Sequence, residues 1–188
     1  MIKRILFTGA TMMFSFSAFA ANTIVEMKTS MGNVEIELFD EQAPVSVKNF
    51  ENYINSGFYK GTIFHRVISD FMIQGGGMTA DMIEKEAQPT IINESNNGLV
   101  NERGTLSMAR RNDPNSAASQ FFINVADNDF LNKDESNAGY AVFGKVIKGM
   151  DIVDEISKVP TTTVGFSKDV PKKPIKIESI KIITNKKS

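Results

Sequence analysis

Residues 64–75 place a single arginine, Arg66, inside a run of large apolar side chains. In an extended strand, alternation puts Arg66 on the same face as Phe64 and Ile68, which are residue types that folded proteins usually bury. A guanidinium on an apolar face costs several kcal/mol unless another group satisfies it. The sequence therefore predicts that Arg66 has a dedicated partner or is kept for a ligand.

A second segment that could take part in chemistry, Leu106–Asn124, ends in an amide followed by two aromatic residues. These are Gln120, Phe121 and Phe122. Neighbouring residues of a strand face opposite sides of the sheet, so one phenylalanine can fill the core while the other lines a surface pocket.

Several familiar chemistries lack the residues they need. The chain has no cysteine and one histidine, which argues against a transition-metal site. A serine–histidine–acid triad would require that histidine, His65, yet no Gly-x-Ser-x-Gly motif presents a nucleophile. A structural, hydrogen-bonded His65 is therefore favoured over a catalytic one. The carboxylates are dispersed, which gives no support to a glycosidase pair.

Two further motifs have ordinary interpretations. Gly75–Gly77 lacks the Lys-Ser/Thr that follows the glycines of a phosphate-binding loop, and it is interpreted as a close turn. Arg110 and Arg111 could clamp a phosphate, but a solvated pair of loop residues is favoured.

The predicted elements that would position these residues are mostly short strands. A hairpin is predicted at Thr23–Phe39, and helices are predicted at Pro44–Ser56, capped by Gly57, and at Met150–Lys158. Further strands are predicted at Thr62–Ile68, Phe71–Gln74, Thr105–Ala109, Phe121–Val125, Ala141–Val146 and Ile175–Ile183, the last with a bulge near Ser179. This pattern indicates a closed or sandwiched antiparallel sheet, with long, potentially functional connections at Gly75–Glu102 and Ala126–Gly139.

The first twenty residues resemble a secretory signal peptide. Lys3 and Arg4 precede an uncharged apolar stretch, and Ala18-Phe19-Ala20 has the small-x-small pattern of a cleavage site. The stretch is too short for a membrane anchor, so we expect a mature domain at residues 21–188 without stable membrane association. Loss of both basic residues changes the formal charge from −1 to −3, which argues against nucleic acid as a partner. Absence of cysteine is compatible with a periplasmic location.

The two segments resemble the signature regions of the cyclophilin family of peptidyl-prolyl cis-trans isomerases. The signal peptide, Phe130 and the segment Gly139-Tyr-Ala-Val-Phe-Gly-Lys-Val146 make the chain most similar to periplasmic cyclophilins of bacteria. The resemblance covers about residues 22–184. It implies a mostly β fold, a closed eight-stranded antiparallel β-barrel capped by two α-helices, and an isomerase that needs no metal or cofactor.

The resemblance also implies site residues. Arg66 matches the catalytic arginine and Gln74 the glutamine that positions it. The implied substrate-binding positions are Phe71, Met72, Phe122 and Leu131 in the apolar wall of the proline pocket, Gln120 as a contacting amide, Ala109 and Arg110 along the bound peptide, and Phe130 and Tyr140. Phe130 and Tyr140 replace the tryptophan and histidine of many cyclophilins. Phenylalanine cannot donate an indole N–H bond, so weak sensitivity to cyclosporin is expected.

The implied function is the isomerisation of Xaa-Pro bonds in exported proteins, which assists their folding in the periplasm. The expected partners are proline-containing peptides and unfolded exported chains, and the expected state is a monomer. One alternative is a non-enzymatic chaperone that holds peptides in the same groove. Another is a lipocalin-like carrier, which would need a hollow barrel, whereas the abundance of Phe, Ile and Met favours a filled one.

Overall fold

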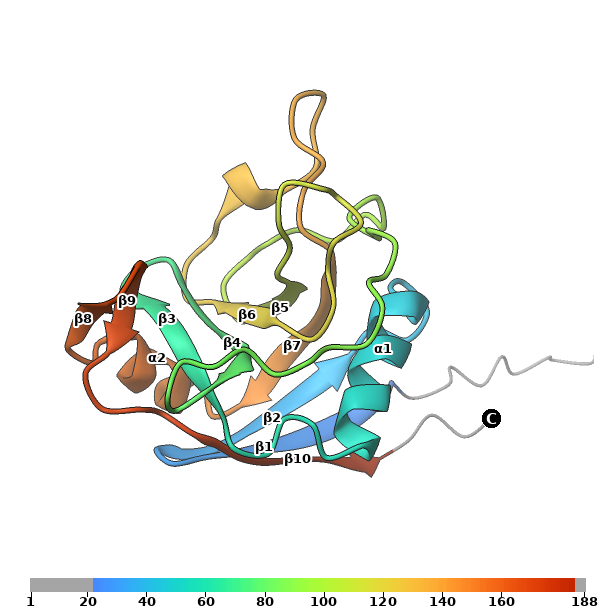
Figure 1. Ribbon diagram of the computed structural model, residues 1–188. Helices are drawn as coiled ribbons and strands as arrows, with labels where there is room; N and C mark the ends of the chain where they lie inside the picture. Colours follow the sequence, from blue (N-terminus) through green and yellow to red (C-terminus); the bar gives the residue numbers. More distant parts are fainter. Residues whose placement is uncertain (1–21, 185–188) are drawn as a thin grey trace, which may run out of the picture.

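The computed structural model of the protein describes residues 22–184, so the predicted signal peptide lies outside the described residues (Figure 1). The chain begins with the predicted hairpin of β1 (Ile24–Thr29) and β2 (Gly32–Leu38). The other elements are α1 (Pro44–Asn55), β3 (Thr62–Ile68), β4 (Met72–Thr79), β5 (Thr105–Met108), β6 (Phe121–Asn124), the 3₁₀ helix η1 (Asp129–Leu131), β7 (Val142–Lys148), α2 (Met150–Ser157), β8 (Thr161–Val164), β9 (Ser167–Pro171) and β10 (Ile177–Thr184).

Eight strands form one antiparallel sheet in the order β10-β1-β2-β7-β5-β6-β4-β3. The order confirms the predicted mostly β fold. The prediction of a closed barrel is wrong, because the edge strands β10 and β3 do not form a continuous ladder. The two edges meet through one isolated bridge, between Ile63 and Lys176. Two backbone hydrogen bonds flank it, from the N–H of Gly61 to the Ile177 carbonyl and from the N–H of Phe64 to the Ile175 carbonyl. Pro171 and Pro174 carry no amide donor, which limits pairing in the segment that precedes β10.

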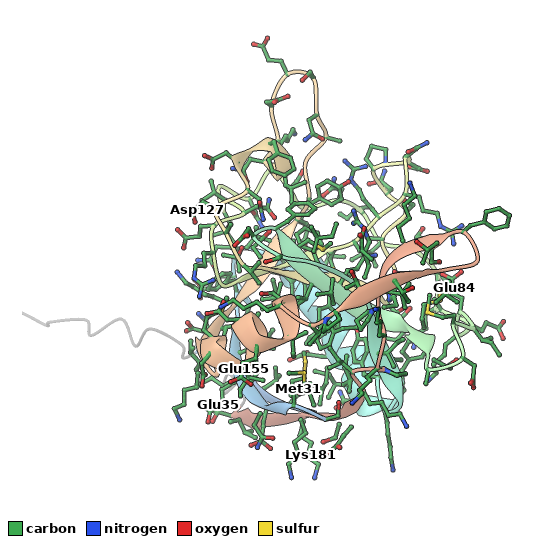
Figure 2. The ribbon with its side chains drawn as sticks, turned by 90° about the vertical axis from the view of Figure 1, so that its left-hand side faces the viewer. Met31, Glu35, Glu84, Asp127, Glu155 and Lys181 are labelled. Atoms are coloured by element: carbon green, nitrogen blue, oxygen red, sulfur yellow. The ribbon has the colours of Figure 1, made fainter. Side chains whose placement is uncertain are left out.

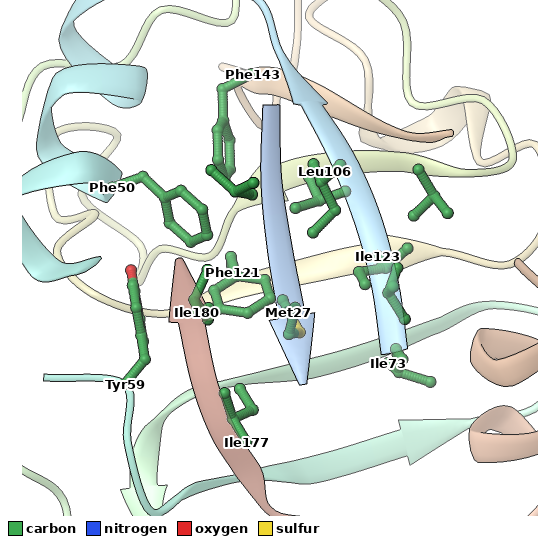
Figure 3. Close-up of a cluster of buried hydrophobic side chains, with 14 of the residues drawn as sticks. Met27, Phe50, Tyr59, Ile73, Leu106, Phe121, Ile123, Phe143, Ile177 and Ile180 are labelled. Atoms are coloured by element: carbon green, nitrogen blue, oxygen red, sulfur yellow. The ribbon is translucent and has the colours of Figure 1, made fainter. Parts of the chain in front are cut away.

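The interior of the curled sheet is filled by apolar side chains (Figure 3). Phe50 of α1 is fully buried, and its ring centroid lies 5.1 Å from that of Tyr59, 5.4 Å from that of Phe121 and 5.2 Å from that of Phe143. Tilted and edge-on arrangements at these distances are the ones that aromatic rings prefer when they pack together. The sheet therefore has a packed core, which contradicts a hollow carrier.

The helices cover different parts of the sheet. α1 packs against β10 and β7, whereas α2 packs against β2, β3 and β4 (Figure 1). α1 starts at Pro44 and is followed by Gly57, whose φ of +68° suits glycine. Both predicted helices are confirmed within one residue of their predicted ends.

Charged side chains remain on the outside of this assembly (Figure 2). Figure 2 shows Glu35, Glu155 and Lys181 on one part of the surface, while Glu84 and Asp127 lie on opposite sides of the view. Glu84 belongs to the connection that follows β4, which is also the strand of Gln74.

The structure differs from the sequence-based predictions at two places. Gly75–Gly77 is not a turn, because all three residues lie inside β4. A Cβ on Gly76 would lie 2.7 Å from the Phe121 ring, and one on Gly77 would lie 2.4 Å from Cγ of Gln120. The glycines thus allow close packing against β4. The hairpin of β8 and β9 was not predicted at all, and its residues are largely exposed.

The predicted bulge in the last strand is confirmed. Lys28 pairs with Ser179 and Thr29 with Ile177, so Glu178 is the extra residue of β10. No helix in residues 22–184 is long and apolar enough to span a membrane. Within the same residues, no group of three or more His, Cys, Asp or Glu side chains is arranged to hold a metal ion.

A carboxylate from a distant loop caps the N-terminus of α1. Glu94 accepts hydrogen bonds from the backbone N–H groups of Val45 at 3.0 Å and Ser46 at 2.7 Å, and from the Ser46 hydroxyl at 2.7 Å. The first turn has no acidic residue of its own, and Ala43 cannot cap it. Glu94 therefore satisfies donors that the helix leaves open, and its charge complements the helix dipole.

We predict that Glu94→Ala lowers the free energy of unfolding by about 1–2 kcal/mol, because it removes a charged N-terminal cap. Urea denaturation followed by circular dichroism measures the change. Glu86→Ala is the control, since Glu86 lies exposed in the same connection. Equal stability of the two variants would contradict the capping role.

Candidate active site

Strand register places four residues in a row across one face of the sheet. Arg66 on β3 pairs with Gln74 on β4, Gln74 pairs with Phe122 on β6, and Phe122 pairs with Ser107 on β5. Directly opposed residues of an antiparallel pair point to the same side. Residues that lie far apart in the sequence thereby share one surface.

A bulge decides which face receives Arg66. Phe64 pairs with Gly75 and Arg66 with Gln74, so His65 is the extra residue between two consecutive positions of β4. The prediction that Phe64 shares a face with Arg66 is therefore wrong, because simple alternation fails across a bulge. Phe64 belongs to the interior core, whereas Ile68 packs on the outer face beside the site, as predicted.

Seven apolar or aromatic side chains form a second, smaller cluster on this outer face, which we call the apolar wall. Its members are Met72, Phe122 and Leu131, which are buried, and Ile68, Phe71, Ala109 and Tyr140, which are partly buried. Six of these positions were predicted as site residues, and the structure brings them together. Phe121 lies in the core and Phe122 in the apolar wall, which confirms their predicted separation.

Two pairs of aromatic rings pack against each other at the apolar wall. The Phe71 ring stacks on the Phe130 ring at 5.4 Å, and the Phe122 ring meets the Tyr140 ring edge-on at 5.6 Å. Phe130 lies in η1 and is 65% exposed. An aromatic side chain that is stacked yet open to solvent is available for contact with a ligand.

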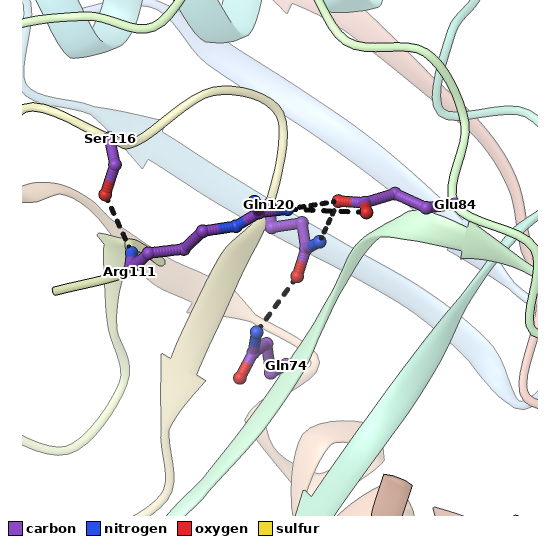
Figure 4. A network of polar contacts seen from close by, with 5 residues as sticks. All are labelled: Gln74, Glu84, Arg111, Ser116 and Gln120. Carbon is purple, nitrogen blue, oxygen red and sulfur yellow. Dashed lines mark hydrogen bonds and ion pairs between the residues drawn. The ribbon is translucent and has the colours of Figure 1, made fainter. Parts of the chain in front are cut away.

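A chain of side-chain hydrogen bonds links Arg66 to Glu84 through two amides. Nη1 of Arg66 donates to Oε1 of Gln74 at 3.5 Å, and Nε2 of Gln74 donates to Oε1 of Gln120 at 3.0 Å. Nε2 of Gln120 in turn donates to Oε1 of Glu84 at 3.3 Å (Figure 4). We call Gln74 and Gln120 the amide relay. Arg66 thus has the partner that its position demands, and most of its donors are left for a ligand.

Beside the amide relay lies a cavity of about 360 Å³. Its lining includes Gln74, Gln120, Ala109, Arg110, Arg111 and Glu84. The cavity adjoins the row of site residues, so a peptide that reaches Arg66 would have room for a neighbouring side chain here.

Arg110 ties two loops together at the border of the site. Its Nε donates to the Gly139 carbonyl at 3.0 Å and its Nη1 to the Arg111 carbonyl at 2.9 Å. The guanidinium also lies 4.5 Å from the ring centroid of Tyr140. Since carbonyls and a ring occupy the guanidinium, the arrangement does not favour a phosphate clamp.

Sequence reasoning did not identify the buried amides behind the apolar wall. Nδ2 of Asn124 donates to Oδ1 of Asn101 at 3.2 Å, and Oγ of Ser107 donates to the same oxygen at 2.7 Å. Nδ2 of Asn128 donates to Oδ1 of Asn124 at 2.7 Å and to the Phe71 carbonyl at 2.9 Å. These bonds fix the loops that carry Phe71 and η1. The abundance of asparagine in the loops was the only available signal.

His65 is buried and next to Arg66 in the chain. Burial lowers the pKa of its imidazole from 6.5 to about 4, a backbone hydrogen bond at Ile63 opposes this shift, and the charge of Arg66 adds to it. Its Nδ1 has no hydrogen-bond partner in residues 22–184. The ring is therefore neutral at neutral pH, in keeping with a structural role, although the expected hydrogen bonding is incomplete.

The comparisons with known proteins agree with this geometry. The family model described as "Cyclophilin type peptidyl-prolyl cis-trans isomerase/CLD" matches residues 24–182. A peptidyl-prolyl cis-trans isomerase of Acinetobacter baylyi is 59% identical over 182 residues, which cover 97% of this chain and 96% of that protein.

Solved structures give the same result. The crystal structure of a cyclophilin-type peptidyl-prolyl cis-trans isomerase from Cryptosporidium parvum matches with a TM-score of 0.73 and 32% identity, over 87% of this chain and 99% of the other. A crystal structure of the same protein in the presence of the dipeptide Ala-Pro matches with a TM-score of 0.71 and 32% identity, over 86% and 99% of the two chains.

We predict that His65 makes the fold less stable in mild acid. The unfolded histidine takes up a proton below about pH 6.5, whereas the folded one does so only near pH 4. Stability is therefore complete above pH 6.5 and falls as the pH drops towards 4, by at most about 3 kcal/mol from this residue. Urea denaturation at pH 7, 6, 5 and 4.5 measures the slope.

The matched variant is His65→Gln, whose amide stays neutral over the whole range. Its overall stability can differ from that of the natural chain, so the readout is the difference between the two pH slopes. If both proteins lose the same stability between pH 7 and 4.5, His65 is not responsible.

Proposed function

The chain belongs to the cyclophilin-type family and is a peptidyl-prolyl cis-trans isomerase, and we propose that Arg66 carries the catalysis by stabilising the twisted prolyl amide. The observation that supports this role most strongly is the placement of Arg66. It borders the apolar wall, it pairs with Gln74 on the neighbouring strand, and it makes a single long hydrogen bond to that residue.

The reaction needs neither proton transfer nor a covalent intermediate. Amide resonance sets a barrier of about 18–20 kcal/mol, so an Xaa-Pro bond isomerises in about tens to hundreds of seconds without help. A planar prolyl nitrogen has no free lone pair, but the twisted amide of the transition state does. A guanidinium directed at that nitrogen or at the adjacent carbonyl therefore binds the transition state better than either planar form.

The magnitudes show that Arg66 does not act alone. Acceleration to milliseconds requires roughly 10⁴-fold, or about 5.5 kcal/mol. One charged hydrogen bond contributes about 1.5–3 kcal/mol. We assign the remainder to the apolar wall, which excludes water from that bond and anchors the proline ring while the flanking chain rotates.

The same geometry suggests how a peptide would lie. Met72, Phe122 and Leu131 offer a buried apolar surface of the right chemistry for a proline ring, and Gln120 and Ala109 lie at its border. The structure of the Cryptosporidium parvum relative in the presence of Ala-Pro supports a proline-containing ligand. A purely holding function would need only the apolar wall, so the position of Arg66 favours catalysis over the chaperone alternative.

We propose that the enzyme acts as a monomer on exported proteins in the periplasm. Residues 1–20, outside the described residues, support export through their basic start, apolar centre and Ala18-Phe19-Ala20 pattern. Arg66, the amide relay and the apolar wall together supply the charge, the amides and the apolar surface that the proposed mechanism needs, so a monomer would suffice for it.

We predict that Arg66→Ala lowers kcat/KM for an Xaa-Pro peptide by about tenfold to a hundredfold, because the lost charged hydrogen bond is worth about 1.5–3 kcal/mol. NMR exchange or a protease-coupled assay measures the rate. Arg66→Lys should retain part of the activity, since its charge remains but the planar fork does not.

Lys60→Ala is the charge-matched control, because it removes one positive charge from the exposed turn before the same strand. Near-wild-type kcat/KM in Arg66→Ala would show that the proposed role is wrong. Suppression of aggregation by the inactive variant would reveal an additional holding activity.

We predict that a bacterial host exports the full chain and cleaves it after Ala20. Fractionation followed by N-terminal sequencing should find the protein in the periplasm, starting at Ala21. Recovery of a chain that retains the first twenty residues from the cytoplasm would contradict the export proposal.

A further inference from the structure

The amide relay connects two end groups with opposite hydrogen-bonding capacity. Glu84 at one end has a carboxylate, which only accepts when it is ionised, and Arg66 at the other end has a guanidinium, which only donates. Gln74 and Gln120 between them can each do both, depending on which way the amide is turned. The two end groups thus determine how the side-chain amides of Gln74 and Gln120 are oriented.

Only one arrangement satisfies every bond. The Gln120 NH₂ must face the Glu84 carboxylate, which leaves its carbonyl to accept from Gln74 at 3.0 Å. The Gln74 carbonyl is then turned to Arg66, at 3.5 Å. A reversed relay would set an NH₂ group against the guanidinium, donor against donor, and Arg66 would lose its hydrogen bond to Gln74.

The main chain brings Glu84 to this position. The backbone N–H of Lys85 donates to the Gly77 carbonyl at 2.9 Å, that of Thr79 donates to the Ile83 carbonyl at 2.9 Å, and Glu84 forms an isolated bridge with Met78. The segment after β4 therefore folds back along the strand that carries Gln74. Glu84 therefore lies in a segment whose backbone is hydrogen-bonded to β4.

Arg111 contacts both oxygens of the Glu84 carboxylate, and Oε1, 3.5 Å from its Nη2, is also the oxygen that accepts from Gln120. Its Nη2 lies 3.4 Å from Oε2 of Glu84, and its backbone N–H donates to the Ser116 hydroxyl at 2.8 Å (Figure 4). The ion pair is exposed, with side chains that are 80% and 50% accessible, so it adds little stability. Its consequence is geometric, because Arg111 and Gln120 both donate to the same carboxylate and together define where it lies.

The Gln120 side chain packs closely on Gly77 of β4. Gly77 lies under its side chain so closely that a Cβ there would be 2.4 Å from Cγ and 2.7 Å from Cδ of Gln120. A Cβ there would also be 2.7 Å from Nε2, so the stem and the terminal amide of Gln120 both lie against the β4 backbone. Terminal amide torsions are soft, so a fixed acceptor is needed to select one orientation.

We propose that Glu84 is a positioning residue of the isomerase reaction. Through Gln120 and Gln74 it selects the amide orientation that presents an acceptor to Arg66, and this keeps the guanidinium directed at the prolyl amide. The inference rests on the proposed catalytic role of Arg66. Glu84 also lines the cavity beside the amide relay, so a direct contact with a peptide side chain would change KM, whereas positioning of Arg66 acts on kcat.

The sharpest test is Glu84→Lys, which replaces an acceptor-only group by a donor-only group and so favours the reversed relay. We expect kcat for an Xaa-Pro peptide to fall about tenfold, with a smaller change in KM. Glu84→Gln, whose own amide can still accept, should lose about twofold to threefold. Glu86→Lys is the control, since it makes the same charge change at an exposed position two residues further along.

NMR of the side-chain amides of Gln74 and Gln120 gives a readout that a general loss of stability would not move. Their resonances should shift in Glu84→Lys and stay in place in Glu86→Lys, while both variants keep the wild-type melting temperature. Equal kcat and unchanged amide resonances in the two lysine variants would overturn the proposal. If Arg66→Ala shows its expected loss of kcat/KM in the same assay, that outcome refutes the role of Glu84 alone, whereas near-wild-type kcat/KM in Arg66→Ala refutes the catalytic proposal itself.

Discussion

The register of β3 against β4 is the constraint on which the site depends. The extra residue at His65 moves Phe64 into the core and turns Arg66 to the outer face, directly opposite Gln74. Without this bulge a strict two-residue period would put Arg66 on the side of Phe64, inside a dry core where an unpaired charge costs several kcal/mol. One inserted residue thus places Arg66 on the outer face, where its charge is available to a ligand, and keeps it out of the core.

The two faces of the sheet have separate tasks, and neighbouring residues serve both. Phe121 packs edge-on against Phe50 in the core, while Phe122 forms part of the apolar wall beside Gln74. Because the same strands carry both sets of side chains, packing of the core also fixes the backbone positions from which the site residues project. Buried amides around Asn101 and Asn124 extend that rigidity to the loops, since each of these amides bonds to other buried polar groups.

Alternation and turn residues predicted the β1–β2 hairpin, both helices and the bulge in β10. The same reasoning failed where the geometry was not local. It interpreted Gly75–Gly77 as a turn, although these glycines lie within β4 and admit the side chains of Phe121 and Gln120. The closed barrel was implied by the family resemblance, and it is wrong because closure depends on how β10 and β3, which lie far apart in the chain, meet.

The sequence by itself determined the family, the periodic elements and the types of residue at the site, because these depend on local pattern and on two long motifs. Only the tertiary structure decided which face receives Arg66 and that Glu84 lies at the end of the amide relay. Glu84 sits in an irregular connection whose sequence has no periodic signal, and its contact with Gln120 spans 36 positions. Contacts of that kind are set by strand register and packing, which composition and spacing do not encode in readable form.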